Sequence, residues 1–180
     1  IVECGVWRGG SAMLAALTLI KSQQTHRKIY LYDTYEGMPE PTDKDIDIHG
    51  VPYRLLWKKE KEFLSVSLDE VKKNIFSTGY PKENIIFVKG MVQDTIPNTV
   101  PKQIALLRLD TDLYESTYHE LFHLYPKTTS QGVIIIDDYG HFQGSQEATE
   151  KYLSQNPQKV LLHRIDYSCR VWIKPSPTQK

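Results

Sequence analysis

Residues 104–140 read IALLRLDTDLYESTYHELFHLYPKTTSQGVIIIDDYG, and this stretch holds two short apolar runs, at residues 104–109 and 133–136. Both runs are rich in branched side chains, and residues 115–125 between them place apolar side chains on one face of a helix. A strand, a helix and a second strand in this order predict a right-handed βαβ unit with parallel strands. Because the runs are apolar throughout, we expect both strands to be buried on both faces.

Each apolar run ends in acidic residues: Asp110 and Asp112 follow the first run, and Asp137 and Asp138 follow the second. Parallel strands end at the same edge of a sheet, and neighbouring strands lie about 4.8 Å apart, so the four carboxylates would crowd one volume. Such a cluster requires a cation or raised pKa values, and oxygen ligands suit Mg²⁺ first and Ca²⁺ or Mn²⁺ next. An aspartate after a strand can also simply cap the next helix. Two pairs of aspartates after successive strands, at the edge of an open α/β sheet where ligands bind, favour a functional site.

The composition fits one globular domain, because 180 residues with 40% hydrophobic side chains can form a full core. The formal net charge is zero, so we expect neither a nucleic-acid partner nor a membrane partner. No apolar run approaches the length of a membrane span. The two cysteines, Cys4 and Cys169, lie in apolar strand-like segments, which favours a reducing, cytoplasmic location over a disulfide framework or a zinc site.

The chain opens with IVECG, inside a predicted strand at residues 1–3 and without an initiator methionine, so we expect an N-terminal segment to precede it. A glycine-rich turn, ECGVWRGGS at residues 3–11, leads into an apolar helix at residues 12–20. Glycines let the backbone approach a ligand closely, and a helix N-terminus offers free N–H groups to an anion. The pattern departs from the dinucleotide fingerprint G-x-G-x-x-G, so on its own it is equally consistent with simple turn geometry.

A second predicted strand, KIYLY at residues 28–32, ends in Asp33. An acid at the tip of the second strand, downstream of a glycine turn, is placed to accept hydrogen bonds from two ribose hydroxyls. This arrangement predicts a nucleoside cofactor, with a helix N-cap as the alternative role for Asp33.

Residues 34–62 form a long connection that mixes turn residues with large apolar side chains, which is typical of a lid or a partner-contact segment. We expect this connection to be mobile without ligand, and its charged run at residues 58–62 to form a solvated helix face. Residues 63–78 then predict a helix, with Ser67 and Glu70 as a capping box and Gly79 as the stop.

A third predicted strand occupies residues 84–89, and Met91, Val92 and Gln93 follow it closely. These three side chains offer apolar faces and a polar edge to a base. Ordinary packing beneath a loop is the alternative interpretation.

The C-terminal region predicts a helix at residues 144–154 and two strands at residues 160–164 and 170–174. The link between these strands is so short that they must form an antiparallel hairpin at the sheet edge. The whole pattern predicts an α/β fold: a Rossmann-like, doubly wound, mostly parallel seven-stranded sheet of the class I S-adenosylmethionine (SAM) methyltransferase type. We expect a single domain over residues 1–174 and a flexible tail at residues 175–180.

A family resemblance rests on five segments: VECGVWRGGS, YDTYEGMPEP, FVKGMVQDTIP, LLRLDTDLYEST and VIIIDDYG. With these segments the chain resembles the macrocin O-methyltransferase (TylF-type) family, metal-dependent SAM enzymes that methylate sugar hydroxyls of antibiotics and related products. The resemblance runs from residue 2 to residue 140 in the family order and spacing. LRLDTDLYEST is its most specific part, and the glycine turn is its least specific part.

The resemblance implies a role for each matching site residue. It places the methionine portion of SAM among Glu3, Gly5, Gly9 and Ser11, the ribose on Asp33, and the adenine among Tyr35, Met91, Val92 and Gln93. It makes Asp110, Asp137 and Asp138 the ligands of Mg²⁺, and Asp112 the general base. His141, which follows the second acidic pair, is the rival base.

The function implied by the resemblance is Mg²⁺-dependent transfer of a methyl group from SAM to a hydroxyl of a small molecule, a sugar or another natural product. Two alternatives stay open: a phenol- or catechol-type acceptor, and a non-catalytic SAM-binding module of a larger protein. A homo-oligomer also stays open. The family usually has a Gly-x-Arg-x-Ala pattern here, and residues 144–148, GSQEA, lack the arginine. The resemblance therefore does not carry over any role of this arginine in assembly or acceptor binding. We expect the acceptor pocket to come from residues 34–62 and from an N-terminal segment.

Overall fold

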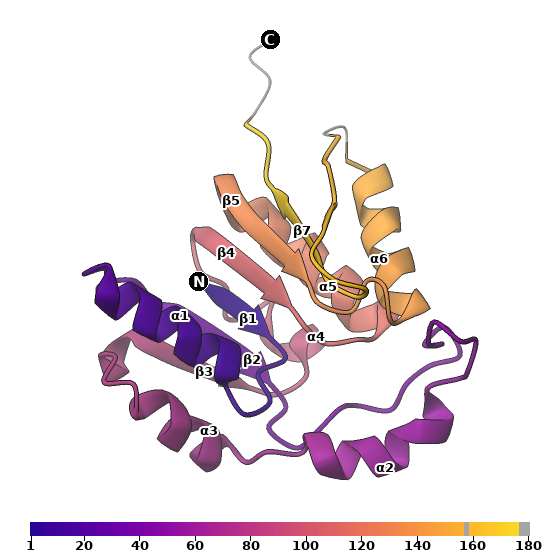
Figure 1. Ribbon diagram of the computed structural model, residues 1–180, viewed down its shortest axis with the longest axis horizontal. Helices are drawn as coiled ribbons and strands as arrows, with labels where there is room; N and C mark the ends of the chain where they lie inside the picture. The colour runs from indigo at the N-terminus through magenta and orange to yellow at the C-terminus, as the bar shows by residue number, and fades with distance from the viewer. Residues whose placement is uncertain (157–158, 177–180) are drawn as a thin grey trace.

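The computed structural model describes residues 1–156 and 159–176 and contains one seven-stranded sheet (Figure 1). The strands lie in the order β3-β2-β1-β4-β5-β7-β6; β1 to β5 are parallel, and β7 runs antiparallel to both β5 and β6. This arrangement confirms the predicted Rossmann-like sheet with its C-terminal antiparallel hairpin. The strands are β1 (Val2–Cys4), β2 (Ile29–Asp33), β3 (Ile85–Lys89), β4 (Ile104–Leu109), β5 (Thr128–Ile136), β6 (His163–Arg164) and β7 (Arg170–Ile173).

Helices lie on both faces of the sheet and make a three-layered molecule (Figure 1). The first and third helices cover one face, the fourth to sixth cover the other, and the second lies beyond the carboxyl ends of the parallel strands (Figure 1). The helices are α1 (Gly10–Lys21), α2 (Arg54–Leu64), α3 (Leu68–Phe76), α4 (Val92–Thr95), α5 (Tyr114–Leu124) and α6 (Gln143–Ser154), with 3₁₀ turns η1 (Lys82–Asn84) and η2 (Tyr125–Lys127).

The core is divided between the two faces because successive residues of a strand point to opposite sides. On β2, Ile29 and Leu31 pack with residues of α1 and α3, whereas Tyr32 packs with residues of α4 and α5. Leu107 of β4 and Ile134 of β5 are fully buried and lie opposite each other. Burial of such a side chain contributes about 1.5–3 kcal/mol. These contacts fix the positions at which β4 and β5 end.

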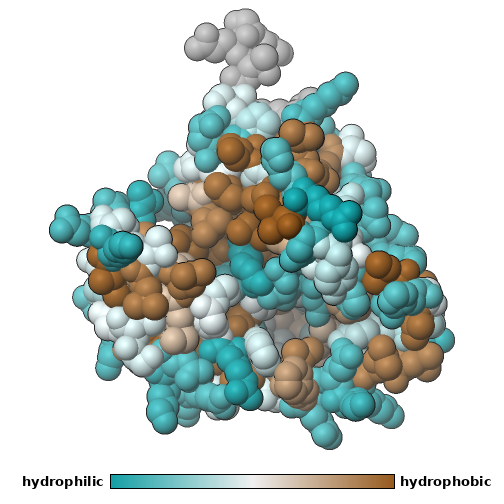
Figure 2. All heavy atoms as spheres, in the orientation of Figure 1, coloured by the Kyte–Doolittle hydropathy of each residue, from teal (hydrophilic) through white to brown (hydrophobic). Residues whose placement is uncertain are grey.

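The face that carries α1 is left open over β4, β5 and β7 (Figure 1). Leu106 pairs with Val133, and Val133 pairs with Ile173, so these three side chains share this face. Figure 2 shows apolar side chains gathered at this place, and Ile173 is 56% exposed. No helix within residues 1–156 and 159–176 covers this part of the sheet.

The predicted βαβ unit is confirmed as β4, α5 and β5. The strand β5 begins at Thr128, earlier than the apolar run that predicted it. Thr128 pairs with Ile104, and the register then shifts between Ile104 and Leu106. An irregular start of this kind carries no apolar pattern, so the sequence did not indicate it.

Helix α2 lies inside the predicted lid and contains the helix face that was predicted at residues 58–62. The prediction of a helix from residue 63 was wrong, because that helix begins only at Leu68. Ser67 explains this start: its backbone is extended, and its hydroxyl accepts a hydrogen bond from the Glu70 N–H at 3.3 Å, as the capping box predicted. No residue of α2 is buried, which agrees with a solvated charged face at residues 58–62.

Smaller differences occur near the cofactor edge and the C-terminus. Residues 92–95 form the short helix α4, which the sequence interpretation did not include. The strand β6 keeps only His163–Arg164 of the strand predicted at residues 160–164. Of the predicted tail, residues 177–180 lie outside the described residues. Among the described residues, no helix combines the length and the apolar character that crossing a membrane would require.

Candidate active site

The glycine turn after β1 brings the ends of β1 and β4 into direct contact. Gly5 has a φ of +78°, and its N–H donates to the carbonyl of Tyr32 at 2.9 Å. A β-carbon on Gly5 would lie 1.8 Å from the carbonyl oxygen of Asp110. The positive φ and the close approach both require glycine at this position. The acidic end of β4 is thereby set beside the turn that was expected to approach a ligand.

Asp33 ties the same turn to the end of β2. Its Oδ2 accepts hydrogen bonds from the N–H groups of Val6 and Trp7 at 2.7 and 3.1 Å, and its Oδ1 accepts one from Tyr35 at 2.7 Å. A carboxylate has about four acceptor positions, so two ribose hydroxyls would have to exchange with one of these bonds. The ribose contact stays a prediction, and the structure adds a role in holding the turn.

A cavity of about 250 Å³ opens between the glycine turn, the start of α4 and the end of β4. Of the predicted cofactor residues, Gly5, Asp33, Met91, Val92 and Gln93 line it. The Oε1 atom of Gln93 is buried and has no hydrogen-bond partner among the described residues. A buried acceptor without a donor costs about 1–3 kcal/mol. It therefore fits a ligand that brings an N–H group, as an adenine amino group would.

The other four predicted cofactor residues do not line this cavity. Glu3 is 3% exposed and accepts a hydrogen bond from the Ser11 hydroxyl, and burial raises the pKa of its carboxyl. Gly9 stands at the N-cap of α1. The ring of Tyr35 lies in the core, where its hydroxyl donates to the carbonyl of Leu31 at 3.1 Å. The structure thus does not bring Tyr35 to the cavity, and the roles of the other three stay predictions.

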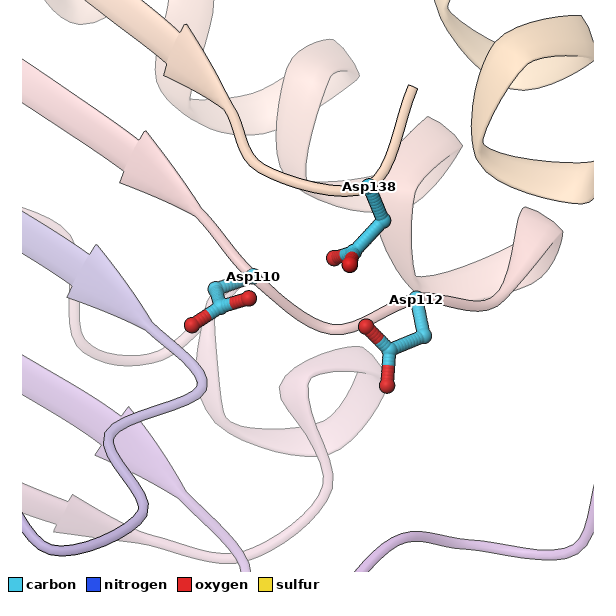
Figure 3. A group of neighbouring side chains, drawn as sticks. All are labelled: Asp110, Asp112 and Asp138. Carbon is cyan, nitrogen blue, oxygen red and sulfur yellow. The ribbon is translucent and has the colours of Figure 1, made fainter. Parts of the chain in front are cut away.

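The segments that follow β4 and β5 bring three carboxylates together (Figure 3). One oxygen each of Asp110, Asp112 and Asp138 lies within 4.8 Å of the other two. Asp112 has a φ of +63°, so the chain turns away from the direction of β4 directly after Thr111. The sequence predicted that acidic side chains after two successive strands would lie close together, and the structure shows this for Asp110, Asp112 and Asp138.

Full ionisation of this cluster is unfavourable. Burial, followed by the negative charge of Asp138, raises the pKa of Asp110 to about 8. Burial raises the pKa of Asp112 to about 7, although its hydrogen bond with Asp138 acts in the opposite direction. Burial and the neighbouring Asp112 raise the pKa of Asp138 as well. A divalent cation among these oxygens would offset the repulsion, so the donor set fits a hard ion such as Mg²⁺.

Asp137 differs from the other three acids because it faces an arginine. Its Oδ1 lies 2.9 Å from Nη2 of Arg108, and Nη1 of the same arginine lies 2.5 Å from Oδ2 of Asp110. A ligand role for Asp137 would require its carboxylate to be shared between the ion and Arg108. Our interpretation of the sequence did not include Arg108, although a cation inside an apolar strand is a signal that it has buried partners.

Glu120 is a second residue that the sequence interpretation missed. It is fully buried on α5, and its two carboxyl oxygens lie 3.0 and 3.1 Å from the hydroxyl of Thr111, the residue between Asp110 and Asp112. Burial raises the pKa of Glu120 well above its ordinary value. The contact braces the turn that carries both aspartates. The available signal was an acid beside Leu121, on the inward face of the predicted helix.

The long connection supplies Tyr53, which packs beside the acidic cluster. Its ring centroid lies 4.7 Å from that of Phe142, and its hydroxyl donates to Glu60. Burial raises the pKa of Tyr53, and Asp112 is among the charges that raise it further. His141, the rival base, lines a different cavity from the one that Asp112 lines. The geometry therefore places Asp112, and not His141, beside the predicted cofactor position.

A family model described as Macrocin-O-methyltransferase (TylF) matches residues 1–174. The chain belongs to this family. The match confirms the resemblance seen in the sequence and extends it beyond residue 140 through the C-terminal hairpin.

Three relatives show what this chain is similar to. The 8-demethyl-8-(2,3-dimethoxy-alpha-L-rhamnosyl)-tetracenomycin-C 4'-O-methyltransferase of Streptomyces olivaceus is 37% identical over 172 residues, 96% of this chain and 64% of the relative. The demethyldecarbamoylnovobiocin O-methyltransferase of Streptomyces niveus is 32% identical, over 84% of this chain and 57% of the relative. The mycinamicin III 3''-O-methyltransferase of Micromonospora griseorubida is 32% identical, over 96% of this chain and 67% of the relative. The chain thus spans 57% to 67% of the length of these relatives.

Two solved structures show what this chain is similar to in three dimensions. The O-methyltransferase NovP superposes with a TM-score of 0.87 at 30% identity, over 98% of this chain and 72% of NovP. The calicheamicin methyltransferase CalS11 superposes with a TM-score of 0.73 at 22% identity, over 96% of this chain and 71% of CalS11, which supports the fold alone.

Proposed function

We propose that this chain carries the catalytic site of a SAM-dependent O-methyltransferase, which uses Mg²⁺ and methylates a hydroxyl on a sugar or another part of a natural product. The proposal is supported mainly by one cavity that is lined both by predicted cofactor residues and by residues of the acidic cluster. Gly5 and Asp33 line it at the predicted cofactor position, and Asp110 and Asp112 line it at the acidic edge. A cofactor held at the glycine turn would therefore face the carboxylates.

When bound, SAM would supply an electrophilic methyl group, and Mg²⁺ would lower the pKa of the acceptor hydroxyl and fix its direction. Asp110, Asp137 and Asp138 are the proposed ligands of the ion. The clustered oxygens and the raised pKa values of Asp110 and Asp138 support these two ligands. Asp137 lies outside the cluster of Asp110, Asp112 and Asp138, so its ligand role rests on the family resemblance. Methyl transfer is an in-line displacement, so the main task of the chain is to hold acceptor and cofactor in line.

Asp112 is the proposed general base for the acceptor hydroxyl. Its pKa of about 7 suits proton uptake near neutral pH. A positioned base of this kind contributes roughly 10²–10⁴-fold to a rate. Thr111 and the buried Glu120 brace the turn on which Asp112 lies, which keeps its carboxylate at the cavity wall.

The proposed acceptor class rests on the names of the relatives. These proteins are named for O-methylation of a rhamnosyl-tetracenomycin, of demethyldecarbamoylnovobiocin and of mycinamicin III. The acceptor is therefore proposed as a glycosylated natural product, without a choice among scaffolds.

Methyl-labelled SAM tests the proposal when it is incubated with the full chain and two sets of acceptors, glycosylated natural products and simple phenols or catechols. We expect label on a sugar hydroxyl with Mg²⁺, little transfer with a chelator, and little transfer by Asp112→Asn. Label on phenols alone would support the catechol-type alternative. Tight SAM binding without transfer to any acceptor would support a non-catalytic module.

A further inference from the structure

Arg108 lies near the carboxyl end of β4, between the predicted cofactor residues and the predicted metal ligands. Its Nη1 lies 2.9 Å from Oε1 of Glu3 and 2.5 Å from Oδ2 of Asp110, and its Nη2 lies 2.9 Å from Oδ1 of Asp137. In the sheet register Arg108 stands opposite Glu3 of β1 on one side and opposite Ile135 of β5 on the other. One guanidinium therefore joins three carboxylates from three separate segments.

We propose that Arg108 is a positioning residue that couples the cofactor subsite at Glu3 to the metal subsite at Asp110 and Asp137. The three contacts are observed directly, whereas the ligands assigned to the two subsites rest on the proposed function. Nothing in the proposed chemistry requires Arg108 to touch the methyl group or the acceptor.

The chemistry of arginine suits this task. A guanidinium is planar, always charged and carries five N–H donors in a fixed fork, so it can hold several carboxylates in a defined relative orientation. Burial disfavours the charged form of Arg108, but Asp110, Glu3 and Asp137 offset this and raise its pKa above the ordinary value. The Arg108 side chain is 21% exposed and that of Glu3 is 4% exposed. The contact between Arg108 and Glu3 is therefore screened less than a surface ion pair.

The network leaves room for ligands on both sides. The contacts with Arg108 use Oδ2 of Asp110 and Oδ1 of Asp137, and a carboxylate has a second oxygen that can bind an ion. On the other side, Glu3 accepts from both Arg108 and Ser11, and Ser11 lies in the first turn of α1. A shift of the guanidinium toward one partner changes its distance to the others. Binding at one subsite should therefore change the affinity of the other, by the reciprocity of linked binding.

Two possible roles for Arg108 predict opposite changes in Mg²⁺ affinity when the arginine is replaced. If Arg108 only compensates charge, Arg108→Gln makes the acidic edge more negative, and Mg²⁺ should bind more tightly. If Arg108 positions the carboxylates, Arg108→Gln should weaken Mg²⁺ binding by about tenfold to a hundredfold. Losses of this size are usual when a residue that orients a metal-ligating side chain is replaced. Arg108→Lys keeps the charge and loses the fork, so it should also weaken Mg²⁺ binding.

Calorimetric titrations of the full chain separate these roles. Mg²⁺ is titrated with and without saturating SAM, for the wild type, Arg108→Gln, Arg108→Lys and the control Arg27→Gln, which removes the same charge at an exposed position. We expect weaker Mg²⁺ binding for both Arg108 variants, with a smaller effect of SAM on the Mg²⁺ affinity, and wild-type values for Arg27→Gln. Thermal unfolding checks that each variant is folded, and Arg108→Lys decides the matter if Arg108→Gln does not fold.

Unchanged or tighter Mg²⁺ binding by the folded Arg108 variants, with wild-type coupling to SAM, would overturn the positioning role and leave the proposed function intact. A wild-type protein that binds neither Mg²⁺ nor SAM would overturn the proposed function. It would also overturn the proposed coupling between the two subsites.

Discussion

Gly5 and Asp110 are in backbone contact at the point where β1 and β4 end: a β-carbon on residue 5 would lie 1.8 Å from the carbonyl oxygen of Asp110. A carbonyl oxygen cannot move as a flexible side chain can, so any side chain at residue 5 must displace the end of β4. The same contact places the proposed cofactor turn against the proposed metal site.

Gly5→Ala should therefore damage both subsites. The added methyl group meets a backbone atom, and alanine is strained at a φ of +78°. We expect a loss of about 1–3 kcal/mol in the free energy of unfolding and weaker binding of SAM. Denaturant unfolding and calorimetry measure these effects. Gly10→Ala is the matched control, because a β-carbon there meets no atom within 4 Å. Wild-type SAM affinity in a stable Gly5→Ala protein would contradict this account of the turn.

Asp33→Ala should lower both stability and SAM affinity. The substitution leaves the N–H groups of Val6, Trp7 and Tyr35 without their acceptor. The hydrogen bonds of Val6 and Tyr35 are partly buried, and a fully buried donor without an acceptor costs about 1–3 kcal/mol, so we expect a smaller loss for each. We expect a folded protein with a lower melting temperature and at least about tenfold weaker SAM binding. Glu83→Ala removes an exposed carboxylate and serves as the control. If calorimetry on folded Asp33→Ala gave the wild-type SAM affinity, the ribose assignment would be wrong.

Helix α2 should open more readily than the sheet in the absence of ligand. None of its residues is buried, so little apolar contact opposes local unfolding. The turn before it is held more firmly, because Asp45 accepts hydrogen bonds from Thr42 and from the N–H of Tyr114. We expect amide hydrogens of α2 to exchange at least about tenfold faster than those of β4 and to slow when SAM binds. Equal protection of α2 and β4 in the free protein would contradict the predicted mobility of this segment.

The elements with a regular apolar pattern could be predicted from the sequence, because burial itself creates the pattern. The runs at β4 and β5 and the acids that follow them are examples. Helix α2 could not be predicted in this way, since it buries none of its residues. The break before α3 depends on the side chain of Ser67, and a Ser67–Glu70 capping box was visible without showing that a second helix ended just before it.

The contact partners of individual site residues could not be predicted from the sequence. Arg108 meets Glu3 across 105 positions of the chain, and only the register of β1 on β4 brings them together. The same limit applies to Asp137, whose contact with Arg108 depends on the end of β5. Tyr35 follows Asp33 closely and was assigned to the adenine, but its positive φ of 53° accompanies a ring that lies in the core.

The stability of the metal-free protein should depend on pH through Asp110 and Asp112. Their pKa values of about 8 and about 7 lie above the ordinary value of 3.8, so the folded state binds these protons more tightly than the unfolded state. Their contribution to stability is therefore full below about pH 4 and is lost as the pH rises toward 8. Relative to the double variant Asp110→Asn/Asp112→Asn, the wild type should lose stability between pH 5 and 8. Mg²⁺ should bind more tightly over the same range, because ligand protons must leave. A constant difference across this range would contradict the raised pKa values.

A titration of Mg²⁺ into the SAM-saturated protein, paired with turnover on a competent acceptor, tests the central claim most directly. The wild type and the variants Asp110→Asn, Asp112→Asn, Asp137→Asn and Asp138→Asn should all fold, since each substitution changes little volume. Substitution of Asp110, Asp112 or Asp138 also reduces the repulsion within their cluster. We expect weaker Mg²⁺ binding for Asp110→Asn, Asp137→Asn and Asp138→Asn, whereas Asp112→Asn keeps Mg²⁺ and SAM and loses most of its turnover. Loss of metal by Asp112→Asn as severe as that by Asp110→Asn would make Asp112 a ligand. Unchanged Mg²⁺ binding in all four variants would contradict the metal-dependent mechanism altogether.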